Sequence, residues 1–259
     1  MMNYVKSEFY RVSHSTGIYY LTGILAVLSF LLNAILWWFG QTEGSGFRYD
    51  TTSFSFSNLV ANPMFFCVMA AVTGIVLYEG NRKNGNLKNT IAFGISRTKA
   101  FAGECIVATV MAILSLIVVL AIYIASTTAL LEHTGPVSLI DLLTEIPAVF
   151  FVAVASLISA IVCIEASGKD STGIILWFVI WFVIPKAFFY LGLRIEVFHN
   201  IAMWMPDNFF GTSGMSVNMS QSITAWGTTE GMTKCLVSGL VGIVIFSLAG
   251  IILLRKKEI

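Results

Sequence analysis

Six long apolar runs constrain this chain more than any other feature, because each can cross the hydrocarbon core of a bilayer. They occupy residues 18–39, 59–78, 101–126, 143–165, 172–193 and 232–254. Hydrophobic residues make up 57% of the 259 residues and charged residues 11%, whereas a soluble domain carries about 25% charged residues. The sequence therefore predicts an all-α integral membrane protein with six transmembrane helices. The net charge of +1 argues against a nucleic-acid partner, because such proteins usually show a strong basic excess.

An amphipathic segment, residues 1–17, precedes the first run. Its apolar side carries Tyr4 or Val5, Phe9 and Val12, while Lys6, Ser7, Arg11 and His14 fall largely on the other side. This pattern is typical of a helix that lies in the membrane interface. We therefore expect an interfacial amphipathic helix, with a solvated N-terminal tail as the alternative.

The basic residues predict the orientation of the spans, because cytoplasmic segments carry an excess of Lys and Arg. With both termini in the cytoplasm, eleven basic residues fall on inner segments and four on outer segments. The inner residues are Lys6, Arg11, Arg82, Lys83, Lys88, Arg97, Lys99, Lys169, Arg255, Lys256 and Lys257, and the outer ones are Arg48, Lys186, Arg194 and Lys234. Both termini, including the tail 255–259, are therefore expected inside.

Two connecting segments are expected on the outer side. Residues 40–58 are rich in Gly, Ser and Thr and read as a loop, after which Pro63 would occupy the first turn of the second span, where proline is tolerated. Residues 195–231 form the longest outer segment, in which apolar residues such as Trp204 and Phe209 recur. We expect this amphipathic segment to lie partly in the outer interface or to dip back into the protein.

The inner loop 79–100 is the most polar long interval between the spans. It holds five of the fifteen basic residues, Arg82, Lys83, Lys88, Arg97 and Lys99. Asn86 can cap a short helix there, and the residues Leu87, Ile91 and Ile95 recur with helical spacing on one face. The pattern predicts a helix lying flat on the inner membrane surface.

Gly85, Leu87, Lys88 and the run from Gly94 to Arg97 resemble the cytoplasmic loop of ABC-2-type transporter permeases. The resemblance implies an N-terminal interfacial helix, six spans and cytoplasmic termini in the bacterial plasma membrane. It also implies that the loop contacts a separate cytoplasmic ABC ATPase, and that the chain pairs with a second copy or a related permease. Permeases of this size in the family resemble those that export antimicrobial or amphipathic peptides, including lantibiotic self-protection systems.

Residues for catalysis or metal binding are not apparent in the sequence. No Walker A motif occurs, since Gly168-Lys169-Asp170 lacks the earlier glycine and the following Ser/Thr of a phosphate-binding loop. The three histidines are too dispersed for a paired metal site, and the four cysteines are expected to be buried free thiols. We therefore predict no enzyme activity and no cofactor in this chain, with ATP and Mg²⁺ bound by the partner ATPase.

Two groups of residues follow from this interpretation. The residues expected at the ATPase contact are Glu79, Arg82, Leu87, Lys88, Asn89, Ile91, Ile95 and Arg97, and those expected along a substrate pathway are Asn33, Thr109 and Ser115. For Asn33 a role in helix packing competes with substrate contact. Because the spans are nearly free of charge, the expected cargo is an amphipathic peptide or lipophilic compound drawn from the membrane lipids. Export of a lipid or envelope glycolipid, and a non-transporting scaffold or sensor, are the alternatives.

Overall fold

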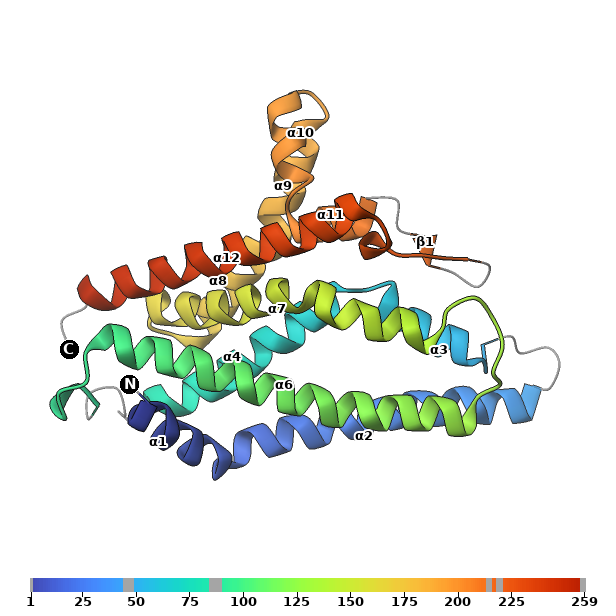
Figure 1. The fold of residues 1–259 in the computed structure, drawn as a ribbon, viewed down its shortest axis with the longest axis horizontal. Coiled ribbons are helices and arrows are strands. Elements are labelled where there is room, and N and C mark those ends of the chain that lie inside the picture. Colours follow the sequence, from blue (N-terminus) through green and yellow to red (C-terminus); the bar gives the residue numbers. More distant parts are fainter. Residues whose placement is uncertain (1, 44–48, 84–89, 213–215, 218–220, 257–259) are drawn as a thin grey trace.

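The computed structural model describes residues 2–43, 49–83, 90–212, 216–217 and 221–256, and nearly all of these are helical (Figure 1). The first half contains α1 (Met2–Ser13), α2 (Thr16–Glu43), α3 (Thr52–Val60), α4 (Met64–Lys83) and α6 (Arg97–Leu130). The second half contains α7 (Leu139–Ser167), α8 (Asp170–Phe178), the π-helix η2 (Val179–Val183), α9 (Ile184–Gly192), α10 (Glu196–Ala202), α11 (Pro206–Thr212), the strands β1 (Ser216–Val217) and β2 (Ser222–Ile223), the 3₁₀-helix η3 (Ala225–Gly227) and α12 (Thr229–Lys256). The prediction of an all-α membrane protein is confirmed at this level.

Within the described residues, five helical segments are long and apolar enough to span a membrane: α2, α6, α7, the continuous stretch from α8 to α9, and α12. The predicted second span, residues 59–78, is not one straight helix. Instead α3 and α4 meet at an angle of 65° across a three-residue break. Pro63 lies in this break rather than in a first helical turn, and a proline disfavours helix at the residue before it.

The segment 40–58, predicted as a loop, is largely helical at both ends. α2 continues to Glu43, and α3 begins at Thr52. The hydroxyl of Thr51 accepts a hydrogen bond from the Phe54 N–H and so caps α3. The Ser- and Thr-rich composition reads as a loop, but these side chains are buried in α3, where Ser53 accepts the Val137 N–H at 3.0 Å.

α7 is the central helix of the bundle. It packs against α4 on one side and α12 on another. Two thirds of the residues in its most apolar stretch are buried, whereas about one tenth are buried in the corresponding stretches of α2 and α12. Gly239 and Gly242 of α12 leave no room for a side chain against Phe151 and Ala155 of α7. Both termini lie at the same end of the bundle, and α3 lies toward the other end (Figure 1).

The fifth span is irregular where it meets Pro185. A π-helical turn, η2, separates α8 from α9, and the Ile184 N–H donates to the carbonyl of Val179. α9 and α10 pack on each other and project from the side of the bundle past α12 (Figure 1). Lys186 at the base of this arm pairs with Asp207 of α11 at 2.9 Å. Several apolar side chains of the arm are exposed, namely Tyr190, Leu191, Leu193, Ile195, Val197 and Ile201.

A buried polar network joins α2, α3 and α6 near the end opposite the termini. The Asn33 amide donates to the Tyr123 carbonyl and to the hydroxyls of Ser126 and Thr127. Its carbonyl oxygen accepts the Ser55 hydroxyl at 2.7 Å. Every hydrogen-bonding atom of this amide therefore has a protein partner, as an amide buried in hydrocarbon requires.

We predict that Asn33→Ala lowers the free energy of unfolding by about 1 to 2 kcal/mol, because it leaves several buried hydroxyls short of a partner. Thr42→Ala is the control, since the Thr42 hydroxyl bonds only carbonyls of its own helix and is exposed. Equilibrium unfolding in mixed micelles measures both changes. Equal effects of the two substitutions would contradict the role assigned to the network.

Candidate functional site

A largely apolar cavity of about 480 Å³ lies among the spans, between α2, α4, α6 and α7. Leucine, phenylalanine, valine, isoleucine, methionine and alanine make up most of its wall. Representative lining residues are Leu28 and Leu32 of α2, Phe66 and Met69 of α4, Ala112 and Leu116 of α6, and Val149 and Ala153 of α7. A cavity of this volume can hold a drug-sized ligand or part of a chain molecule.

Two of the predicted pathway residues, Thr109 and Ser115, line this cavity. The Ser115 hydroxyl bonds that of Thr22 at 2.7 Å, and the Thr109 hydroxyl donates to the Cys105 carbonyl at 2.8 Å. Both hydroxyls already have hydrogen-bond partners within the protein. The cavity wall therefore offers a ligand little besides apolar surface. Asn33, the third predicted residue, does not line the cavity and belongs to the interhelical network described above.

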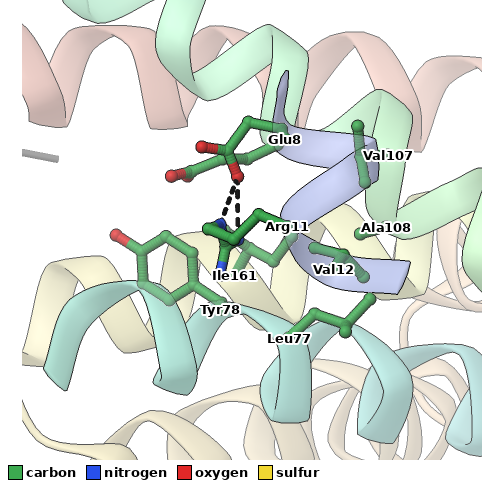
Figure 2. A pocket seen from close by; sticks show the side chains of 9 residues that line it. Glu8, Arg11, Val12, Leu77, Tyr78, Val107, Ala108 and Ile161 are labelled. Carbon is green, nitrogen blue, oxygen red and sulfur yellow. Dashed lines mark hydrogen bonds and ion pairs between the residues drawn. The ribbon is translucent and has the colours of Figure 1, made fainter. Parts of the chain in front are cut away.

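A second, polar site lies where α1 packs on α4 and α6, toward the termini (Figure 2). Arg11 donates to the Glu8 carboxylate from two nitrogens, at 3.0 and 2.7 Å. Glu104 of α6 lines the same small pocket, and Tyr78 of α4 donates its hydroxyl to Glu165 of α7. The three carboxyl groups are all at least nine-tenths buried. One guanidinium thus lies among three carboxyl groups contributed by three different helices.

Tyr4 connects this polar cluster to the inner loop. Its hydroxyl interacts with the side chains of Glu8 and Thr90, and its ring lies against Gly103, where a larger residue would collide with it. Burial raises the pKa of Tyr4 well above its ordinary value, and the nearby carboxyl groups of Glu104 and Glu8 raise it further. The phenol therefore stays neutral and able to donate a hydrogen bond.

The predicted ATPase-contact residues are only partly described by the structure. Leu87, Lys88 and Asn89 lie outside the described residues, as does the side chain of Arg82, whereas Glu79 is half-buried in α4. Ile91 lies in a helical turn that ends at Ala92, and Gly94 follows with φ of 84°. The predicted helical stripe therefore does not reach Ile95, which lies in non-helical chain between the turn and α6.

Arg97 has a structural partner that could not be predicted from its place in the sequence. It begins α6 and donates to the carbonyl of Leu254 at 3.0 Å, which ties the loop to the last turns of α12. Phe93, just before Gly94, is 86% exposed and is the most exposed large apolar side chain among the described residues. Its exposure in a polar loop could not be distinguished from burial by sequence pattern alone.

The carboxyl groups at the helix ends were not predicted as a cluster. Glu104 and Glu165 fall near the ends of the predicted spans 101–126 and 143–165, and no sequence pattern indicates that they share a site. The packing of α1 on α6 places Glu8 and Glu104 in one pocket, and Glu165 is buried beside Tyr78 of α4. Within the described ranges, no group of three or more His, Cys, Asp or Glu side chains is arranged to hold a metal ion.

The comparisons with known proteins do not extend this description. No protein-family model matches the chain, and no curated protein is similar to it.

We predict that Arg11→Ala lowers the free energy of unfolding by about 2 kcal/mol, because it removes the cation beside buried carboxyl groups. The value is below that of a fully buried pair, since the Arg11 side chain is 30% exposed. Lys6→Ala removes the same charge from the exposed side of α1 and should change stability little. Thermal unfolding in detergent tests both, and an Arg11→Ala protein as stable as Lys6→Ala would refute the role of Arg11.

Proposed function

We propose that this chain is the membrane permease subunit of an ABC transporter that exports an amphipathic peptide or lipophilic compound. The apolar cavity among α2, α4, α6 and α7 is the observation that carries the cargo assignment. Its wall offers a large carbon surface, and its threonine and serine hydroxyls already have partners. A sugar or an ion would lose its hydrogen bonds to water there without replacement, whereas an apolar chain would not.

Coupling to ATP hydrolysis is assigned to the loop between α4 and α6, which resembles that of ABC-2-type permeases. The exposed Phe93 and the adjoining Ile91 offer an apolar contact for a cytoplasmic ATPase that binds ATP and Mg²⁺. Two internal contacts, Arg97 with Leu254 and Tyr4 with Thr90, join the loop to α12 and α1. Because the loop also connects α4 directly to α6, and both helices line the cavity, a movement of the loop would be transmitted to the cavity wall.

Pairing of two permease chains belongs to the same proposal. The arm formed by α9 and α10 projects from the bundle with exposed apolar side chains (Figure 1). A second copy or a related permease packed against it would bury this surface, and lipid would cover it otherwise.

Export of a lipid is the second candidate, because an acyl chain suits the same apolar wall. The two cargo classes differ in the polar part that must remain outside the cavity. For a peptide this part is the backbone, and for a lipid it is the headgroup. Competition between probes of the two classes therefore separates them.

Filling the cavity should abolish cargo binding. We expect Ala112→Trp, on the cavity wall, to weaken binding of a dansyl-labelled amphipathic peptide to the chain in nanodiscs by at least about tenfold, or about 1.4 kcal/mol. Ala121→Trp, on the exposed face of the same helix, is the matched control and should bind normally. Fluorescence titration measures both. Binding of a labelled phospholipid, together with no binding of the peptide, would favour the lipid exporter. Unchanged peptide binding by Ala112→Trp would show that the cavity is not the cargo site.

Polar replacement on the loop should uncouple the chain from its ATPase. Phe93→Ser and Ile91→Asn should reduce co-purification of an ATPase by at least about tenfold and abolish transport, while membrane insertion persists. Arg97→Glu should do the same, but it also breaks the contact with Leu254. Phe178→Ser, an exposed phenylalanine on α8, is the control. Recovery of the unmodified chain with no ATPase would favour a scaffold or sensor.

A further inference from the structure

Glu145 is a fully buried acid that has no hydrogen-bond partner in the part of the chain that the structure describes. It lies on α7 and has 0% exposure. Among the described residues, neither of its carboxyl oxygens has a hydrogen-bond partner, and none of the ion pairs includes it. Buried polar groups in proteins are nearly always hydrogen-bonded, and ionisable residues inside membrane spans are usually functional. The apolar cavity and the polar cluster at α1 make no use of this group.

The surroundings of Glu145 are almost wholly apolar. Its neighbours on the same helical face, Leu142, Ala148 and Val149, are all buried in the main hydrophobic cluster. Other members of that cluster come from elements at the end of the bundle away from the termini: Phe56 of α3, Phe209 and Phe210 of α11, Trp226 of η3 and Cys235 of α12. The indole N–H of Trp226 also lacks an acceptor among the described residues. This layer therefore contains an unpartnered acid and an unpartnered donor.

The titratable groups around Glu145 do not supply a positive charge. The group that interacts with it electrostatically is the thiol of Cys67 on α4, which in turn lies near Cys235 on α12. Lys234 on α12 pairs with Glu230 at 2.7 Å, and Lys186 on α9 pairs with Asp207 at 2.9 Å. On its own helix, Asp141 accepts the Ser138 N–H at the exposed start of α7. Tyr123 of α6 donates to Ser55, and α3 and η3 add no titratable side chain.

We propose that Glu145 is a proton-binding site that controls the packing of this end of the bundle. In the packed arrangement the carboxyl group is neutral, because no described residue around it supplies a compensating positive charge and burial opposes ionisation. When α3, α11 and η3 separate from α7, water reaches the group and the carboxylic acid releases its proton. Repacking takes one proton back from water.

The sign of the pH dependence follows from this proton balance. The packed arrangement binds one more proton than the open one, so low pH favours packing and rising pH favours opening. One linked proton changes the ratio of open to packed molecules by up to about tenfold for each pH unit. The direction is independent of which cargo the protein carries and of whether an ATPase binds it.

The native cysteines report this opening. Cys67 and Cys235 are fully buried in the same cluster, whereas Cys105 is buried in a separate cluster nearer the termini. We would measure their rates of reaction with N-ethylmaleimide by mass spectrometry, on the full chain in nanodiscs between pH 6 and 8. Below the thiol pKa, the thiolate fractions of both cysteines rise with pH at the same slope. This common rise cancels in the ratio of the Cys67 labelling rate to the Cys105 labelling rate, so any pH dependence of the ratio reports the opening.

The expected result is a labelling ratio that rises with pH, by up to about tenfold per unit, in the wild-type chain. Glu145→Gln keeps the shape of the protonated acid but cannot ionise, so its ratio should not change with pH. Glu196→Gln, an exposed acid on α10, should behave as wild type. A flat wild-type ratio, or a slope that survives in Glu145→Gln, would overturn the proposal.

Infrared spectroscopy supplies a second test, whose first measurement uses only the wild-type chain. The wild-type chain at neutral pH should show the C=O stretch of a protonated carboxyl group, and absence of any such band would overturn the proposal. Where Glu145→Gln or Glu145→Leu folds, the band should lose intensity. A band unchanged in both variants would assign the proton to the carboxyl groups near α1 and refute the site.

Discussion

Close packing of α7 against its neighbours is the interaction on which the rest of the structure depends. Glycines on both sides permit it: Gly74 of α4 meets Leu157, and Gly239 and Gly242 of α12 meet Phe151 and Ala155. In a bilayer, helices gain little from hydrophobic association, so close contact and interhelical hydrogen bonds must hold them together. Ser156 donates to the Cys67 carbonyl, and Ser159 accepts the indole N–H of Trp181. These bonds fasten α4 and the fifth span to the central helix.

The polar groups buried among the spans fall into three kinds with different consequences. The side-chain amide of Asn33 hydrogen-bonds to four protein atoms and so joins α2 to α3 and α6. Near α1, Glu8 accepts from Arg11 of the same helix, Glu165 accepts from Tyr78 of α4, and Glu104 of α6 lines the same pocket as Arg11. Glu145 has no partner within the described ranges. The surroundings of each buried polar group therefore decide whether it joins helices, as Asn33 does, or is left without a hydrogen-bond partner among the described residues, as Glu145 is.

The arrangement of these sites connects the loop to the cavity. The polar cluster at α1 and the Arg97 bond to Leu254 lie toward the termini, beside the loop between α4 and α6. The cavity is walled by the same helices, α4 and α6, farther along their length. The cluster around Glu145 lies toward the opposite end. A rigid helix pair that contacts both sites can carry a displacement from one to the other.

The sequence by itself determined the membrane class and the positions of the apolar helices. Apolar length is a local property, so five segments matched the predicted spans, and the predicted N-terminal helix appeared as α1. Only the tertiary structure decided where the second span breaks, since the polar residues of α3 become buried through contacts with the chain after α6. It alone also decided which polar residues share a site. Glu8, Glu104 and Glu165 meet because α1 folds across helix ends far apart in sequence, a pairing that no local pattern encodes.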